Sequence, residues 1–175
     1  MKSNIALVGF MAVGKSAVGQ LLAKKTDKTF VEVDFLIEKN SGKSIKQIFN
    51  EEGEIAFREY EIALIKEISN RKNQVLACGG GVVLNKINID RLKQESVVIW
   101  LTASLQSILE RLQDTGETRP LIAGKNRETE VQSLLRLRQP FYKIAADIRV
   151  DTTGLNVEQV VKKTLIKLKR YANYH

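Results

Sequence analysis

Four residues close to the N-terminus have the types and the spacing of a phosphate-binding loop. Gly9 is followed by four variable positions and then by Gly14, Lys15 and Ser16, which completes the pattern of this motif. The glycines let backbone N–H groups turn toward a chain of phosphates, and a helix starting near Gly14 adds the positive end of its dipole. In this motif the lysine reaches the β- and γ-phosphates and the hydroxyl binds Mg²⁺. The motif therefore predicts a site for a phosphate chain and Mg²⁺.

Two carboxylates follow the next apolar stretch, in the segment VEVDFLIEK. Side chains alternate along a strand, so a strand over 30–33 that continues to Asp34 places Glu32 and Asp34 on one face. Phosphoryl transfer needs one acid near Mg²⁺ and another near the group that accepts the phosphate. The alternative is that Asp34 caps a helix that starts at Phe35.

Arg58 and a run of three glycines are further candidates for binding a ligand. Arg58 lies among acidic residues at helical spacing, including Glu54 and Glu61, so an ion pair on the helix surface is its default interpretation. Gly79, Gly80 and Gly81 directly follow an apolar stretch. Consecutive glycines there are typical of main chain that closely approaches a ligand or another segment, with a sharp turn as the alternative.

The segment 113–129 is polar and longer than most connections in compact domains. It carries Arg119 just before a proline, and we expect a mobile cover that brings this arginine onto the transferring phosphate. The next helix is predicted from Glu128 to about Arg138, ending before Pro140, with Leu137 in the core. Arg138 lies in its last turn, where the helix dipole alone accounts for an arginine.

The elements that must position these residues form an alternating pattern. Apolar stretches of strand type recur with helical stretches between them, which predicts an α/β fold with a mostly parallel sheet and helices on both faces. In such sheets ligands bind beyond the carboxyl ends of the strands. The length of 175 residues suits one domain over 1–175. A helix is predicted from Glu54, with Ile55, Leu64, Ile65 and Ile68 in the core. The predicted strands are 5–8, 30–33, 74–77, 97–101 and 148–150.

Composition excludes some classes of function. The formal net charge of +8 suits an anionic partner, with a solubilising surface charge as the alternative. The sequence has one cysteine, Cys78, and one histidine, His175, which excludes an intramolecular disulfide and histidine catalysis. Cys78 is expected to be a packed residue. We find no signal-peptide pattern and no apolar run of about 18 residues, so we expect a soluble, cytoplasmic protein without a membrane partner.

Seven blocks of sequence together resemble the shikimate kinase family. Their order and spacing agree with the family over nearly the whole chain. The blocks are GFMAVGKS at 9–16, the acidic pair of VEVD at 31–34, FRE at 57–59, CGGG at 78–81, TRPLIAG at 118–124, RLRQPFY at 136–142 and RVDT at 149–152.

The resemblance implies a three-layer P-loop kinase fold, with a five-stranded parallel sheet and a mobile lid at about 113–127. It implies transfer of the γ-phosphoryl group of ATP, with Mg²⁺, to the 3-hydroxyl group of shikimate, in aromatic amino acid biosynthesis. We expect a monomer that binds no nucleic acid. The alternative is another P-loop small-molecule kinase that acts on gluconate or a nucleotide. A nucleic-acid-binding ATPase has less support, because aromatic residues make up 6% of the chain and no stacking platform is evident.

The resemblance also implies roles for individual residues. Asp34 binds the reacting hydroxyl as base or orienting group, Arg58 and Arg138 hold the substrate carboxylate, and Lys15 and Arg119 act on the phosphates. The family usually has aspartate where this chain has Glu32, and we expect activity to be retained. Further implied residues are Met11, Phe57, Gly79, Gly80 and Gly81 for the substrate, Ala12, Val13, Gly14, Lys15, Ser16, Ala17, Arg111, Arg119 and Asn156 for the nucleotide, and Ser16 and Glu32 for the metal.

Overall fold

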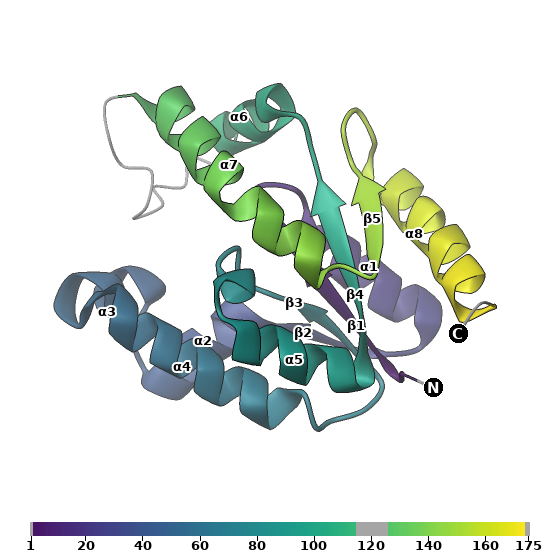
Figure 1. Ribbon diagram of the computed structural model, residues 1–175, viewed down its shortest axis with the longest axis horizontal. Coiled ribbons are helices and arrows are strands. Elements are labelled where there is room, and N and C mark those ends of the chain that lie inside the picture. Colours follow the sequence, from purple (N-terminus) through teal and green to yellow (C-terminus); the bar gives the residue numbers. More distant parts are fainter. Residues whose placement is uncertain (1, 115–125, 174–175) are drawn as a thin grey trace.

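A central sheet with helices on both faces organises the chain (Figure 1). The structure is a computed structural model and describes residues 2–114 and 126–173. The elements are, in order, β1 (Asn4–Val8), α1 (Lys15–Thr26), β2 (Thr29–Glu32), α2 (Val33–Ser41), α3 (Ile45–Glu51), α4 (Gly53–Ile68), β3 (Gln74–Ala77), the 3₁₀ helix η1 (Val82–Leu84), α5 (Lys86–Glu95), β4 (Ser96–Thr102), α6 (Leu105–Asp114), α7 (Arg127–Ala145), β5 (Ile148–Asp151) and α8 (Val157–Ala172).

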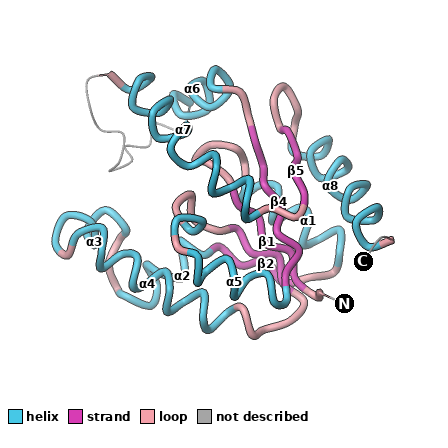
Figure 2. The backbone as a smooth tube through the Cα atoms, in the orientation of Figure 1, coloured by secondary structure: helices cyan, strands magenta, loops and turns pink. Residues whose placement is uncertain are grey.

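The strands form one parallel sheet in the order β2-β3-β1-β4-β5 (Figure 2). The order in which strands are added to the sheet changes side at β1. β3 pairs with one edge of β1, and β4 pairs with the other edge. This is the arrangement in which α/β proteins bind ligands beyond the strand ends. The predicted fold class is confirmed, and each predicted strand lies within one residue of the observed one at either end.

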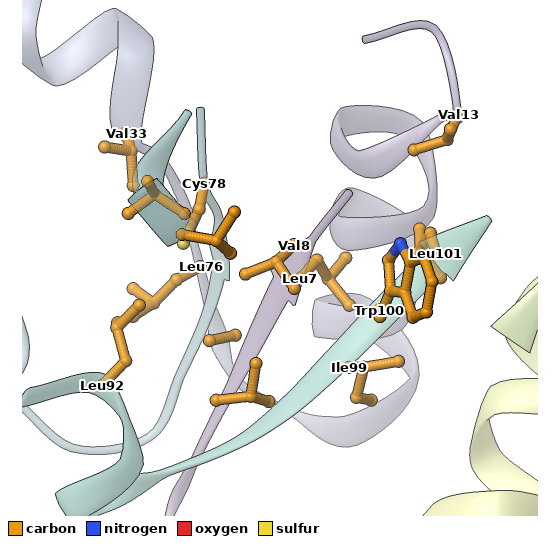
Figure 3. Close-up of a cluster of buried hydrophobic side chains, with 14 of the residues drawn as sticks. Leu7, Val8, Val13, Val33, Leu76, Cys78, Leu92, Ile99, Trp100 and Leu101 are labelled. Atoms are coloured by element: carbon orange, nitrogen blue, oxygen red, sulfur yellow. The ribbon is translucent and has the colours of Figure 1, made fainter. Parts of the chain in front are cut away.

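Apolar burial on both faces holds the sheet in place. Leu7 of β1, Leu76 of β3 and Ile99 of β4 are fully buried, and Figure 3 shows them in one cluster of buried apolar side chains, with Leu76 on the side of Leu92 of α5. Helices α1 and α8 cover one face, and α4, α5 and α7 lie on the other (Figure 1). Strands buried on both faces read as continuous apolar runs, which is why the sequence pattern located β1, β3 and β4.

The boundary between β2 and α2 differs from the prediction. The strand ends at Glu32 and the helix begins at Val33, so Asp34 lies in the first helical turn. The alternation argument for Glu32 and Asp34 is therefore wrong, and so is the interpretation of Asp34 as the cap of a helix starting at Phe35. Val33 is fully buried, and an apolar residue satisfies that burial in a helical turn as well as in a strand.

Helix α7 is longer than predicted and faces the core with different residues. It passes through Pro140 and ends at Ala145. A proline removes one backbone donor, but the buried Tyr142 and Ala145 beyond it keep the helix packed. Leu137 is 63% exposed and Ile55 of α4 is 80% exposed, so both expected core positions are wrong. Leu64, Ile65 and Ile68 are buried as predicted.

None of the helices within residues 2–114 and 126–173 combines the length and the apolar character needed to cross a membrane.

Candidate active site

The loop between β1 and α1 has the backbone geometry of an anion-binding loop. Gly9 has a φ of 149°, and a Cβ atom there would collide with the carbonyl oxygen of Leu101. No other residue type fits this close approach. Gly14 is the N-cap of α1 in a left-handed conformation, and α1 begins at Lys15 with no acidic residue in its first turn. The positive end of the helix dipole therefore faces the loop without a competing carboxylate.

Lys15 folds back over the loop. Its Nζ atom donates to the carbonyl oxygens of Gly9 at 3.0 Å and Phe10 at 2.8 Å. Ser16 follows in the first turn of α1. The loop thus places an ammonium group, a hydroxyl group and the N-terminus of a helix around one space, as the motif predicted.

A cavity of about 340 Å³ opens beside this loop. Side chains and backbone from α2, α3, α4, α7 and the glycine run meet there. It is lined by Met11, Ala12, Gly14, Lys15, Ser16, Ala17, Glu32, Asp34, Ile45, Phe49, Phe57, Arg58, Glu61, Cys78, Gly79, Gly80, Gly81 and Arg138. Most predicted site residues therefore come together, although they span more than a hundred positions of the sequence.

Arg58 of α4 is held between two carboxylates. Its Nη2 atom is 3.0 Å from Glu54 Oε1, and its Nη1 atom is 3.2 Å from Glu61 Oε2. The guanidinium also lies over the ring of Phe57, 5.1 Å from its centroid. The expected ion pairs on α4 therefore exist, and they hold the guanidinium at the wall of the cavity. A Cβ atom on Gly81 would collide with this group, so the glycine run makes room for Arg58.

Arg138 of α7 is a buried cation beside the glycine run. The residue is 3% exposed, and its Nε atom has no hydrogen-bond partner among the described residues. Burial lowers the pKa of its guanidinium, while a hydrogen bond with Tyr142 opposes that shift. The hydroxyl of Tyr142 in turn donates to the carbonyl oxygen of Gly80. A buried guanidinium with an unused donor is costly unless an anion binds it.

Asp34 completes the cavity on the side of α2. A Cβ atom on Gly79 would lie 2.7 Å from Asp34 Oδ1 and 3.2 Å from Glu61 Oε1. The two carboxylates therefore flank the same glycine. The arrangement joins a phosphate-binding loop, a carboxylate and two guanidinium groups from different helices, which suits transfer of a phosphoryl group to an acidic acceptor.

Known proteins are similar to this chain in sequence and in fold. The family model described as shikimate kinase matches residues 11–169. The chain belongs to the shikimate kinase family. The shikimate kinase of Thermodesulfovibrio yellowstonii is 45% identical over 170 residues, covering 97% of each chain. That of Persephonella marina is 42% identical over 166 residues, covering 95% of this chain and 99% of the other.

A solved structure agrees with this assignment. The shikimate kinase from Acinetobacter baumannii in complex with shikimate has a TM-score of 0.91 and 34% identity to this chain, covering 97% of this chain and 94% of that one. The family predicted from the seven sequence blocks is therefore confirmed. The alternative of a gluconate or nucleotide kinase is not favoured.

Three of the predicted site residues that the structure describes do not line the cavity. Val13 is buried in the core. Arg111 donates to the carbonyl oxygens of Ala12 at 3.2 Å and Thr152 at 3.0 Å, so it links the phosphate loop to the end of β5. Asn156 caps α8 by accepting from the backbone of Gln159. Arg119, and the predicted lid except residues 113, 114, 126 and 127, lie outside the described residues.

Glu61 lines the cavity, but the sequence analysis did not predict it as a site residue. Its side chain is fully buried. Burial raises the pKa of this carboxyl to about 7, Arg58 and Arg138 oppose the shift, and Asp34 adds to it. The spacing of three residues from Arg58 was a signal, but it does not reveal that the carboxylate faces inward.

The raised pKa of Glu61 predicts how stability depends on pH. Because the pKa in the folded chain, about 7, lies above the ordinary value of 4.5, the folded state binds this proton more tightly than the unfolded state. Glu61 therefore stabilises the fold below the ordinary pKa, and this contribution is lost as the pH rises through about 7. We expect the free energy of unfolding of Glu61→Gln to lack this decline in urea titrations at a series of pH values. Parallel profiles for the two proteins would contradict the assignment.

Proposed function

We propose that this chain transfers the γ-phosphoryl group of ATP to the 3-hydroxyl group of shikimate, giving shikimate 3-phosphate and ADP. The observation that carries the proposal is the convergence of Arg58 and Arg138 on the cavity that also holds Asp34 and the phosphate loop. Membership of the shikimate kinase family and the shikimate-bound relative support this acceptor.

The acceptor half of the cavity matches a small carboxylic acid with hydroxyl groups. The planar guanidinium groups of Arg58 and Arg138 each offer paired N–H donors to a carboxylate. The backbone of the glycine run approaches the acceptor, and Met11 and Phe57 supply apolar wall. Held by its carboxylate at one end, the acceptor directs a hydroxyl group toward Asp34 and the phosphate loop at the other.

The nucleotide half of the cavity suits ATP with Mg²⁺. Ser16 and Glu32 both line the cavity, and hydroxyl and carboxylate oxygens are ligands that Mg²⁺ takes in proteins. Mg²⁺, when bound, supplies positive charge against the β- and γ-phosphates. The longer side chain of Glu32, where the family usually has aspartate, keeps the charge, and we expect activity to be retained.

The protein's own residues supply position and charge for the transfer. The loop amides and Lys15 balance negative charge on the phosphoryl oxygens, and Asp34 orients the attacking hydroxyl and accepts its proton. The two arginines fix the acceptor so that its hydroxyl is in line with the bond that breaks. Little covalent chemistry is required of the chain, because the hydroxyl oxygen itself attacks phosphorus and ADP leaves. Arg119 is proposed to act on the phosphates from outside the described residues.

Replacing Arg58 by alanine is expected mainly to raise KM for shikimate, by about tenfold or more, because a charge-assisted bond to the substrate carboxylate is lost. Steady-state kinetics at saturating ATP measures the effect. Arg71→Ala is the matched control, because Arg71 pairs with Glu67 at the same helical spacing on the exposed surface. An unchanged KM in Arg58→Ala would remove the carboxylate-binding role.

ADP release in the presence of different acceptors tests the proposed reaction. We expect release that depends on shikimate, and none above background with gluconate or nucleoside monophosphates. Release that depends equally on gluconate, or none with shikimate at saturating ATP and Mg²⁺, would overturn the proposal.

A further inference from the structure

A buried amide lies against the buried carboxyl of Glu61. Asn88 of α5 and Glu61 of α4 are both 0% exposed, and Asn88 Nδ2 is 3.5 Å from Glu61 Oε2. The other end of this amide, Asn88 Oδ1, is buried and has no hydrogen-bond partner within the part of the chain that the structure describes. A buried acceptor without a donor is costly. A proton on the Glu61 carboxyl would provide a donor for Asn88 Oδ1 once the amide has rotated.

Charged groups from α2, α4 and α7 surround Glu61 before any acceptor binds. Arg58 from α4 and Arg138 from α7 act on it as cations, and Asp34 from α2 acts as an anion. Glu54 of α4 lies on the far side of Arg58. The neighbours Cys78 and Tyr142 are neutral, because burial raises the pKa of both groups, and α5 contributes the uncharged Asn88.

Binding of the acceptor adds negative charge to this cluster. The carboxylate of shikimate brings a further negative charge to Arg58 and Arg138, which already offset Glu61 and Asp34. Like charges in a buried site favour protonation of one of them. Glu61 is the carboxyl in this group that has a neutral amide, that of Asn88, beside it, whereas Asp34 is needed as the ionised group that orients the hydroxyl.

We propose that Glu61 takes up one proton from solvent when shikimate binds, and that Asn88 is the positioning residue that accepts the resulting O–H hydrogen bond through Oδ1. This inference rests on the proposed function, because it needs the substrate carboxylate between the two arginines. A proton adds to one carboxylate oxygen, and no other bond forms or breaks. Rotation of the amide lets Asn88 donate to ionised Glu61 and accept from protonated Glu61.

Two observations support the protonation of Glu61 and the release of Arg58 to the substrate carboxylate. The pKa of Glu61 is about 7 without any acceptor bound, so a modest further rise protonates the carboxyl near neutral pH. Arg58 Nη1 lies 3.3 Å from Oε1 and 3.2 Å from Oε2 of Glu61. Neutralising Glu61 weakens this ion pair and leaves Arg58 available for the substrate carboxylate.

Isothermal titration calorimetry of the full chain with shikimate tests the proton uptake. Titrations slightly above neutral pH in buffers of different ionisation enthalpy give the number of protons bound per shikimate as a slope. We expect uptake of roughly half a proton or more in the wild type and uptake near zero in Glu61→Gln. Glu54→Gln is the matched control, because Glu54 pairs with the same arginine but is 48% exposed, and it should keep the uptake.

Shikimate binding without proton uptake in the wild type, or uptake unchanged in Glu61→Gln, would overturn the inference while leaving the proposed function intact. A chain that binds no shikimate would instead overturn the proposed function.

The role of Asn88 has its own test in the infrared difference spectrum between shikimate-bound and free protein. We expect the C=O band of a protonated carboxyl to appear on binding and to be absent in Glu61→Gln. In Asn88→Leu the band should change in frequency, because the O–H group has lost its acceptor. A band at the same frequency in Asn88→Leu would remove Asn88 from the account.

A second variant covers the case in which leucine is not tolerated at this buried position. In Asn88→Asp the two carboxyls share a proton before shikimate arrives, so the band should be present in the free protein and proton uptake should fall. ADP binding by each variant, measured in the same calorimeter, reports that the nucleotide half of the site is intact. Full proton uptake in a folded Asn88→Asp protein would also contradict the inference.

Discussion

Asp34→Asn is expected to lower kcat at least about a hundredfold, the scale of losing one electrostatic contact in the transition state. The amide keeps the shape of the side chain but cannot accept the hydroxyl proton. Its NH₂ group donates a hydrogen bond where the carboxylate accepts one, so the hydroxyl is also oriented differently. Asp34 lies in the first turn of α2, on the cavity and beside Gly79. Shikimate binding should change little, because the two arginines that hold its carboxylate remain.

Steady-state assays and calorimetry separate these effects. Asp90→Asn is the matched control, because Asp90 is a surface carboxylate of α5 that pairs with Lys86; its kcat should equal that of the wild type. A near-normal kcat for Asp34→Asn would remove the role assigned to Asp34.

Lys15→Ala is expected to reduce kcat by a similar factor or more, because the ammonium balances charge that develops on the β- and γ-phosphates. In the free chain this group donates to the carbonyl oxygens of Gly9 and Phe10, so its loss also removes contacts that hold the loop. We therefore expect weaker ATP binding together with the lower kcat, as seen by calorimetry with ATP and by single-turnover rates.

The control for this prediction lies on the same helix. Lys24 is an exposed lysine in the last turn of α1, and Lys24→Ala should leave both ATP binding and kcat unchanged. Wild-type turnover in Lys15→Ala would show that the loop works without its lysine, contrary to the proposed mechanism.

The sequence predicted the sheet well because its signals are local and strong. The central strands β1, β3 and β4 are buried almost throughout and appear in the sequence as short apolar runs. The predicted element boundaries are wrong where an apolar residue can be buried equally well in a strand or in a helix. Val33 is buried in a helical turn rather than a strand, and α7 continues through Pro140 because packing beyond the proline outweighs the lost donor.

The candidate site was predictable where a motif fixes the residue types. The phosphate loop, the glycine run and Arg58 all line the cavity as expected. Glu61 and Asn88 were not predicted, because their positions depend on which side of α4 and α5 faces inward. A carboxylate or an amide in a helix is usually exposed. Arg138 shows the converse, since an arginine near a helix end is ordinary in sequence but is 3% exposed in the structure.

The central claim is that one small acid is held by two guanidinium groups while its hydroxyl faces Asp34 and the phosphate loop. A crystal structure of this chain with shikimate and ADP tests it most directly. The account predicts the shikimate carboxylate within hydrogen-bond distance of both Arg58 and Arg138, with the 3-hydroxyl group at Asp34. A carboxylate bound away from either arginine, or a 3-hydroxyl group turned away from Asp34, would contradict it.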